Sequence, residues 1–198
     1  MDKITCVSYL MLTVTTIVGN IKSDPNLHQT YNESLKKNTL ETITIQRSET
    51  EKVRMRKVTD KETDVGFILS SRTSLKDGDV VFLNDTKMII IKLTPELVAI
   101  LKINKHMHSH NSDHVVESDT NHHADNHDFI KVAIKVGHTI GNLHRPLKFD
   151  NDDIIFPIQT PDEVNLFSKL LSDSKDRVEI RAETLIFEPD QGFDIHGH

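Results

Sequence analysis

Apolar and polar residues alternate in short runs along the first half of the chain, and turn-forming residues separate these runs. Alternation with a period of two is typical of strands that bury one face. The runs are LTVTTIVGNI, LETITIQ, EKVRMRKV, DVGFILSS, DVVFLN and KMIIIKL. Hairpin-type turns are expected at Asp77-Gly78 and Asn84-Asp85. We therefore predict an all-β N-terminal domain over residues 11–94, with a polar loop at 23–38.

The pattern changes after Thr94-Pro95, which we interpret as a domain boundary. The run ELVAILKI predicts a strand, and DFIKVAIKVGHTI has the apolar spacing of an amphipathic helix that begins at Asp128 and ends at Gly141. Two short strands, RPLKF and DIIFPI, precede a helix that begins at Thr160-Pro161, and the strand DRVEIRAETLIF comes last. This order predicts a ferredoxin-like βαββαβ domain over residues 95–188, and the fold class as a whole is α+β.

Composition limits the partners and the compartment. The net charge of −6 argues against nucleic acid or an anionic membrane as the main partner. Cys6 is the only cysteine, so neither a disulfide framework nor a thiolate metal cage is available. Threonines dilute the apolar residues near the N-terminus, and no run approaches the roughly 20 apolar residues of a membrane helix. We expect a cytoplasmic protein with no membrane partner, in which residues 1–10 form an N-terminal extension.

Histidines are concentrated between the first strand and the first helix of the predicted second domain. Residues 104–127, the histidine-rich insertion, hold seven of the 12 histidines in the chain. These are His106, His108, His110, His114, His122, His123 and His127. Neutral imidazole is a good ligand for nickel, copper, zinc and iron, so such a tract indicates metal binding. The alternative is a linker of biased composition. In either case we expect the insertion to be disordered. If it binds metal, it would act as a buffer that holds metal ions weakly.

Three of the five histidines outside the insertion are further candidate ligands. His144 follows the predicted end of the first helix, where free carbonyls and the helix dipole favour a cation. One interpretation is a histidine that caps the helix, and the other is a metal ligand that a two-fold dimer would duplicate. His196 and His198 lie in the C-terminal tail, residues 189–198, which could reach such a site.

Three blocks of the sequence resemble one known family. The segment TIGNLHRP resembles the Gly-Asn-x-His-x-Pro motif of the UreE urease accessory proteins, which are nickel metallochaperones. The segment VRMRKVTDKETDVGFILSSRTSLKDGDVVFL is similar to the N-terminal domain of that family, and IFEPDQGFDIHGH is similar to its C-terminal segment. The blocks occur in the same order as in the family, and the resemblance covers most of the chain from residue 11 onward.

The resemblance implies a function and a set of site residues. His144 would bind Ni²⁺ at the interface of a homodimer, and His196 and His198 would complete or supply that site. The N-terminal domain would bind partner proteins, with Lys52, Arg54 and Arg56 as a candidate surface. The protein would not be an enzyme. It would deliver Ni²⁺ to the complex of the urease accessory GTPase and the urease apoprotein, and Zn²⁺ or Cu²⁺ can bind imidazole as well.

The chain departs from the family pattern in the place of its histidines. The strand after the motif reads IIFPIQTP and has none, and the tail has two rather than a long run. We therefore expect the histidine-rich insertion to have taken over the buffering of nickel. One alternative is a general zinc, copper or nickel buffer. Another is a metallohydrolase, because HMHSHNSDH is faintly similar to a His-x-His-x-Asp-His motif, but two extra residues break its spacing and no H-E-x-x-H is present.

Overall fold

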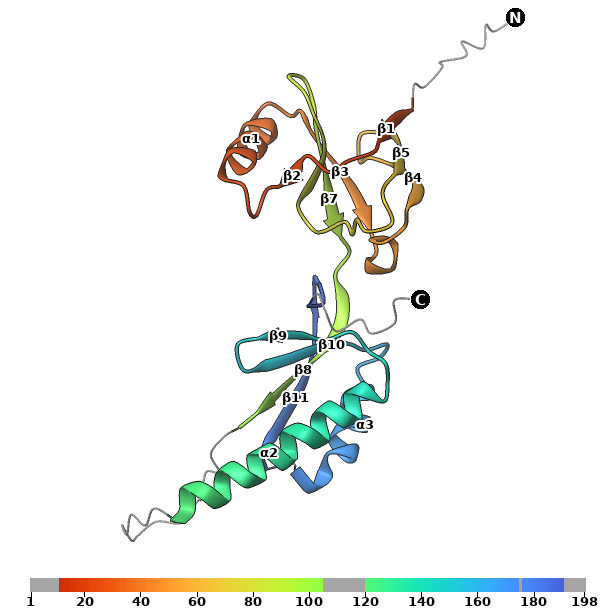
Figure 1. Cartoon of the computed structure of the whole chain (residues 1–198). Coiled ribbons are helices and arrows are strands. Elements are labelled where there is room, and N and C mark those ends of the chain that lie inside the picture. The colour runs from red at the N-terminus through yellow and green to blue at the C-terminus, as the bar shows by residue number, and fades with distance from the viewer. Residues whose placement is uncertain (1–10, 105–119, 175, 191–198) are drawn as a thin grey trace, which may run out of the picture. The chain divides into compact units, whose positions relative to one another are not determined.

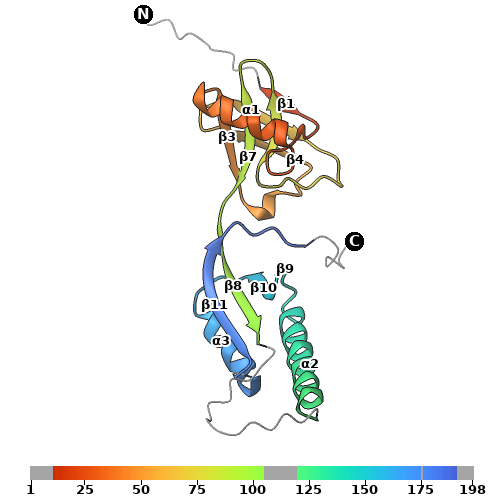
Figure 2. The same ribbon diagram turned by 90° about the vertical axis from the view of Figure 1, so that its left-hand side faces the viewer.

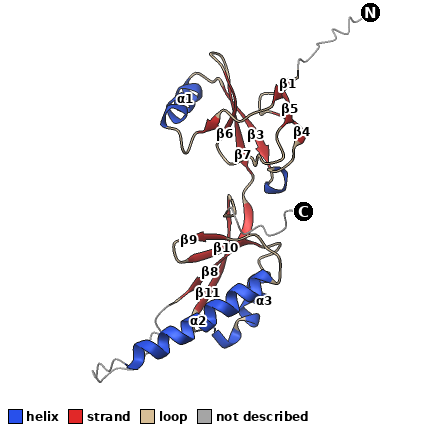
Figure 3. Ribbon diagram, in the orientation of Figure 1, coloured by secondary structure: helices blue, strands red, loops and turns tan. Residues whose placement is uncertain are grey.

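The computed structural model describes residues 11–104, 120–174 and 176–190, with the backbone alone for residues 120–128 (Figure 1). The chain divides after Thr94 into two compact units. Strands predominate in the first unit, the second combines strands with two α-helices, and three α-helices are present among the described residues (Figure 3). The fold is therefore a mixed α and β fold, as the sequence predicts.

The first unit consists of two small sheets. Its strands are β1 (Leu12–Val14), β2 (Gly19–Asn20), β3 (Leu40–Ile45), β4 (Arg54–Val58), β5 (Asp64–Ile68), β6 (Asp79–Leu83) and β7 (Met88–Leu93). One sheet has the order β1-β5-β4 and the other β2-β6-β7-β3. Strand residues such as Ile43, Val65, Phe67, Ile89 and Ile91 are almost completely buried, so the alternating runs do supply the core. Strands thus form most of the first unit, but it also contains a helix, so it is not the all-β domain that the sequence predicts.

The predicted loop at 23–38 is wrong, because this stretch contains helix α1 (Pro25–Lys36). The carboxylate of Asp24 accepts hydrogen bonds from the N–H groups of Asn26 and Leu27, which caps the helix. Leu27 packs into a cluster of buried residues from β3, β6 and β7. A helix with so little buried apolar surface has almost no periodic signal, so packing on the sheet identifies it where the sequence does not.

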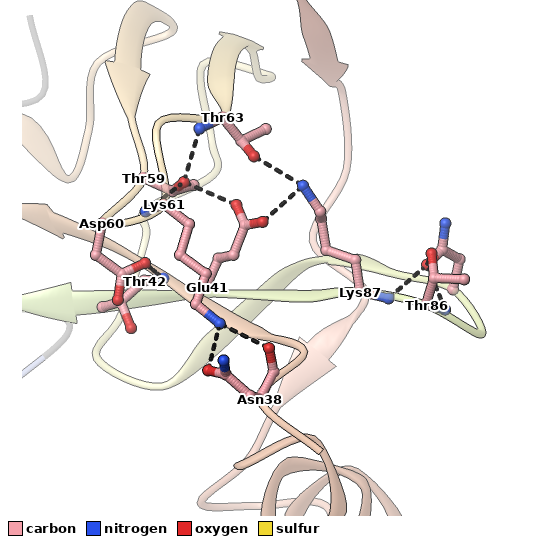
Figure 4. A network of polar contacts seen from close by, with 10 residues as sticks. Asn38, Glu41, Thr42, Thr59, Asp60, Lys61, Thr63, Thr86 and Lys87 are labelled. Carbon is pink, nitrogen blue, oxygen red and sulfur yellow. Dashed lines mark hydrogen bonds and ion pairs between the residues drawn. The ribbon is translucent and has the colours of Figure 1, made fainter. Parts of the chain in front are cut away.

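A buried polar network joins the two sheets of the first unit (Figure 4). Glu41 on β3 accepts a hydrogen bond from the Thr59 hydroxyl at 2.7 Å and lies 2.6 Å from the Lys87 ammonium. Lys87 also donates to the Thr63 hydroxyl at 2.7 Å. Burial raises the pKa of Glu41, but these donors outweigh burial and hold the pKa below its usual value. Because Thr59 and Thr63 flank the turn between β4 and β5, the network fixes that turn on β3.

The second unit is one four-stranded sheet with two helices. Its elements are β8 (Glu96–Ile103), α2 (Thr120–Gly141), β9 (Lys148–Asp150), β10 (Asp153–Pro157), α3 (Glu163–Leu170) and β11 (Val178–Leu185) (Figure 2). The strand order is β11-β8-β10-β9, and each neighbouring pair is antiparallel. β9 therefore lies at one edge of the sheet.

Both faces of this sheet are covered. On one face, Val136 and Ile140 of α2 and Phe167 of α3 join a cluster with Ala99 and Leu101 of β8. The alternate β8 residues, Val98 and Ile100, lie on the opposite face and pack with Phe187, from the segment after β11. The segment after β11 therefore covers part of the second face through Phe187.

Both helices of the second unit start at residues other than those predicted. α2 begins at Thr120 rather than Asp128, so the last residues of the expected disordered insertion are helical. Residues 120–127 have no apolar spacing, which is why the sequence gives no sign of this extension. α3 begins at Glu163 rather than at Thr160-Pro161, and the Glu163 carboxylate accepts hydrogen bonds from the N–H groups of Gln159 and Thr160. The predicted end of α2 at Gly141 is confirmed.

Candidate metal site

His144 lies on a tight turn that ends α2. The N–H of Asn142 donates to the carbonyl of His138, and the N–H of His144 donates to that of Gly141, both at 3.0 Å. These bonds satisfy carbonyls that a helix end leaves open. His144 has a φ of 49°, in the left-handed region, and it is exposed. The turn therefore presents this imidazole at the surface of the second unit.

Arg145 fixes the chain immediately after His144. Its guanidinium donates to the carbonyl of Pro157 and pairs with the carboxylate of Glu163. It also lies 5.9 Å from the centre of the Phe167 ring, which belongs to the core. Only about a fifth of each charged side chain is exposed, 20% for Arg145 and 17% for Glu163. These contacts of Arg145 therefore hold the turn that carries His144 against the end of β10 and the first residue of α3.

Replacing Glu163 tests this attachment. Burial raises the pKa of Glu163, but the N–H of Gln159 and the Arg145 guanidinium outweigh burial and hold the pKa below its usual value. A depressed carboxylate pKa adds stability that is present above the unfolded-state pKa and is lost as the pH falls through the folded-state pKa. We expect Glu163→Gln to lower the free energy of unfolding by about 1–3 kcal/mol at pH 7.

Urea unfolding of wild type and Glu163→Gln at pH 7 and near pH 3 measures this difference. The difference should shrink at the lower pH, because protonation of the wild-type Glu163 carboxylate progressively removes the charged pair as the pH falls. Glu183→Gln is the matched control, because Glu183 is exposed and its contact with Arg181 is long, at 3.8 Å. An equal loss of stability at both pH values would contradict the role of the charged pair.

The last described residues of the chain contact the strand that follows the His144 turn. The N–H of Asp190 donates to the carbonyl of Leu147 at 3.0 Å. The N–H of Phe149 donates to the Asp190 carboxylate at 2.8 Å. His196 and His198 lie outside the described residues, so the structure gives the point from which their segment leaves but no position for either histidine.

An exposed apolar stripe runs along α2 towards the same turn. Ile130 and Ile134 are 51% and 66% exposed, and Gly137 and Gly141 continue the same helix face. A Cβ added at either glycine would meet nothing within 4 Å. Leu143, next to His144, is 41% exposed. The α2 stripe, as we call Ile130, Ile134, Gly137, Gly141 and Leu143, is thus an apolar surface that ends at the candidate ligand.

Sequence reasoning overlooked a second histidine at this end of α2. His138 is exposed, and its Nε2 lies 3.0 Å from the side-chain nitrogen of Asn142, one helical turn further on. In this contact the Asn142 amide nitrogen can only donate, so the His138 Nε2 is the acceptor. The spacing of four residues between His138 and Asn142 is the signal that could have identified the pair.

The other predicted histidines of the insertion lie outside the part of the chain whose side chains the structure describes. His106, His108, His110 and His114 fall in residues 105–119, outside the described chain. His122, His123 and His127 lie on α2, but their side chains are outside the described set. Among the described residues, no three or more histidine, cysteine, aspartate or glutamate side chains are placed to hold one metal ion. Within the described part of a single chain, His144 therefore has no complete ligand set around it.

The three predicted partner-binding cations lie on or just before β4, at the edge of the β1-β5-β4 sheet. Lys52 pairs with Glu49 at 3.2 Å, and Arg56 makes two hydrogen bonds to Asp64, at 2.8 and 2.6 Å. Arg54 is exposed on the same strand. The charges of Lys52 and Arg56 are therefore partly balanced within the chain, so this surface is less basic than its sequence suggests.

Fold and site together define a two-unit protein of mixed α and β structure with a surface histidine at a helix end. In the described part of the chain, no helix has the length and apolarity needed to span a membrane. The sequence model of the UreE urease accessory protein N-terminal domain matches residues 14–94. The chain is also similar to several curated proteins named urease accessory protein UreE.

Two of these relatives show the extent of the similarity. The protein from Edwardsiella ictaluri is 26% identical over 156 residues, which cover 78% of this chain and 61% of the relative. The protein from Yersinia aldovae is 26% identical over 149 residues, which cover 75% of this chain and 57% of the relative. The chain thus spans about three fifths of the length of the curated relatives that it matches. Its first unit is thus similar to the N-terminal domain of the UreE urease accessory proteins, and most of the chain can be aligned with proteins of that name.

Proposed function

We propose that this protein is a nickel-binding metallochaperone that delivers Ni²⁺ to apo-urease during urease maturation. The observation that carries the proposal is the exposed imidazole of His144 on the turn after α2, in a chain that is similar to the UreE urease accessory proteins. Ni²⁺ is the cargo, and neutral imidazole is a suitable ligand for it. Zn²⁺ and Cu²⁺ suit the same ligand, so availability and partner binding would select the metal.

The site requires two copies of the chain. One imidazole is too few ligands, and a two-fold axis near His144 supplies a second from the same position. The α2 stripe supports this arrangement, because two isoleucines that are half or more exposed need an apolar partner and the glycines allow a close approach. We therefore place the homodimer contact along α2, with His144 of each protomer facing the shared ion.

His196 and His198 complete or supply the shared site. Asp190 holds the chain beside Leu147 and Phe149, just after the His144 turn. His196 is six positions after Asp190, and a fully extended chain over six positions spans about 20 Å. The tail histidines are therefore within reach of an ion bound at His144 of the same protomer.

Transfer needs no covalent chemistry. Imidazole ligands on an accessible surface are replaced one at a time by ligands of the recipient, so the ion moves by ligand exchange. The recipient would be the complex of the urease accessory GTPase and the urease apoprotein. The face with Lys52, Arg54 and Arg56 is the candidate docking surface, and Arg54 is its most available cation in view of the pairs that Lys52 and Arg56 make.

The element order of the second unit supports the ferredoxin-like assignment. Its four strands follow in the chain as β8, β9, β10 and β11. In the sheet they lie in the order β11-β8-β10-β9, so the last strand of the chain lies beside the first. Both crossover helices contribute to the core on one face. We assign residues 95–188 to a ferredoxin-like domain on this basis. Its first crossover is the connection in which the histidine-rich insertion lies.

Native mass spectrometry with and without Ni²⁺ tests the proposal directly. We expect a dimer in both conditions and one tightly held Ni²⁺ per dimer after excess metal is removed. A protein that remains monomeric at high concentration, or a dimer that retains no Ni²⁺, would contradict the proposal. Urease activation in a reconstituted system, with and without the protein at limiting Ni²⁺, then tests delivery itself.

The histidine-rich insertion is expected to hold additional, weakly bound ions. Changing all seven of its histidines to serine should lower the number of Ni²⁺ ions bound per dimer in equilibrium dialysis and leave one tight ion. Substitution is preferable to deletion of residues 105–127, because a deletion would also remove the first turns of α2. The matched control changes Asn111, Asn121 and Asn126 to serine. Unchanged stoichiometry in the histidine variant would remove the buffering role.

A further inference from the structure

Arg145 joins the His144 turn to three other parts of the second unit. Its guanidinium donates one hydrogen bond to the carbonyl of Pro157, the last residue of β10, and another to the carboxylate of Glu163, the first residue of α3. The same group lies 5.9 Å from the centre of the Phe167 ring, which is buried. Because a guanidinium is planar and holds its donors in a fixed arrangement, these three contacts leave the Arg145 side chain little freedom to move.

Glu163 is itself held by the loop before α3. Its Oε1 atom accepts hydrogen bonds from the N–H groups of Gln159, at 2.5 Å, and Thr160, at 3.3 Å. Its Oε2 atom accepts from Arg145. The two carboxylate oxygens thus have separate partners, and the loop holds the carboxylate where the guanidinium meets it. A hydrogen bond to a charged group is roughly twice as strong as one between neutral groups, so this link is a firm one.

The backbone at His144 is supported on both sides. Its φ of 49° lies in the left-handed region, which is unfavourable for a residue that has a Cβ atom. On the side of α2, the N–H of His144 donates to the carbonyl of Gly141 at 3.0 Å. On the other side, Arg145 is the next residue of the chain and is fixed through its side chain. The direction of the chain at His144 therefore depends on a hydrogen bond from the helix end and on the contacts of Arg145.

We propose that Arg145 is a positioning residue for the shared Ni²⁺ site, which fixes the backbone direction at His144 so that the imidazoles of both protomers reach one ion. This inference rests on the proposed function, because the direction of His144 matters for nickel only if the ion is bound there. In this role Arg145 does not touch the ion. Its positive charge, which would otherwise repel Ni²⁺, is balanced by Glu163.

The size of the effect follows from what residues that orient a metal ligand contribute elsewhere. Loss of such a residue typically lowers metal affinity about 10–100-fold, so we expect Arg145→Ala to weaken Ni²⁺ binding at least about tenfold in competition with a chelator. Arg145→Lys should lie between this variant and wild type, because an ammonium can pair with Glu163 but lacks the forked geometry of a guanidinium. Arg181→Ala is the matched control, because Arg181 is exposed and its ion pairs are long, at 3.5 and 3.8 Å.

A double-mutant cycle with Glu163 shows whether Arg145 acts through this contact. Glu163→Gln should weaken Ni²⁺ binding as well, since it loosens Arg145 and leaves the charge of Arg145 unbalanced beside the ion. In the Arg145→Ala background the same substitution should have a much smaller effect. Equal effects in the two backgrounds would show two independent contributions and overturn the inference. Urea unfolding sets conditions in which every variant is folded, and Arg145→Lys takes the place of Arg145→Ala in the cycle if the alanine variant does not fold.

Hydrogen exchange provides a readout that a merely structural contact would not change. Because energetic coupling is reciprocal, Ni²⁺ should strengthen the attachment by the same factor that its loss costs in Ni²⁺ affinity. In wild type, Ni²⁺ should therefore slow exchange of the Gln159 and Thr160 N–H groups, which bond to Glu163, about tenfold. This slowing should vanish in Arg145→Ala and also in His144→Ala, although the latter retains the Arg145 contacts. Exchange that is insensitive to Ni²⁺ in wild type would overturn the positioning role.

Failure of this inference and failure of the proposed function give different results. If His144→Ala binds Ni²⁺ as wild type does, the ion is not held at His144 and the proposed site itself is wrong. If His144→Ala loses the tight ion while Arg145→Ala and Arg145→Lys bind it as wild type does, the shared site stands and only the positioning role of Arg145 is overturned.

Discussion

His144→Ala is expected to abolish the tight binding of Ni²⁺ while the dimer persists. In the proposed site each protomer lends one imidazole, so a single substitution removes two ligands from the shared ion. Loss of a residue that only hydrogen-bonds a metal ligand typically lowers metal affinity about 10–100-fold. Loss of the two His144 imidazoles, which would bind the ion directly, should lower it more than about hundredfold. The fold should be unaffected, because His144 is exposed and its turn is held by backbone hydrogen bonds and by Arg145.

Competition with a chelator of known affinity measures this change, and native mass spectrometry reports the number of ions per dimer. His28→Ala is the matched control, because it removes one exposed imidazole from α1 in the other unit. A His144→Ala protein that keeps its tightest Ni²⁺ would show that the ion is bound elsewhere, and the histidine-rich insertion would then be the first place to search.

Ile134→Glu is expected to convert the dimer into monomers. The side chain of Ile134 is 66% exposed in the single chain, so the substitution should change the stability of the monomer by less than about 0.5 kcal/mol. In a two-fold contact along α2 it would place a carboxylate in apolar surroundings on both protomers. Burial of an unpaired charge costs several kcal/mol, so the dissociation constant should rise at least about hundredfold.

Sedimentation equilibrium gives the dissociation constant, and the same sample gives a second result. The tight Ni²⁺ should be lost from Ile134→Glu although His144 is intact, because the two imidazoles no longer meet. Leu35→Glu is the matched control, since Leu35 is 50% exposed on α1 of the first unit. An intact dimer in Ile134→Glu would show that the protomers associate through another face.

Most strands could be predicted from the sequence because their physical cause is local. Alternating residues must point to opposite sides of a strand, so runs such as KMIIIKL and ELVAILKI correspond closely to β7 and β8. α1 could not be predicted in this way. Its signal is a single Asp24 cap and one buried leucine, and the decisive contact is with residues of β3, β6 and β7 that are distant in sequence.

In the candidate site, too, features with a local cause could be predicted and those that depend on distant contacts could not. The place of His144 just after a helix end followed from Gly141 and from the apolar spacing before it, and the structure confirms that helix end. The attachment of the turn did not follow, because Arg145 and Glu163 are 18 residues apart, and Phe149 and Asp190 are 41 apart. The exposure of the α2 stripe could not be predicted either. Periodicity shows that a helix has apolar residues, but it does not show which of them a neighbouring element covers.

The sequence by itself determined the composition of the candidate site, the strands that bury one face, and the helix end where His144 lies. Each of these depends on residue type and on spacing within a few positions. Only the tertiary structure decided that Arg145 and Asp190 hold the chain that follows that turn and that Ile130 and Ile134 remain exposed. The reason is physical: hydrogen bonds between distant segments and the coverage of apolar surface depend on which elements meet in space.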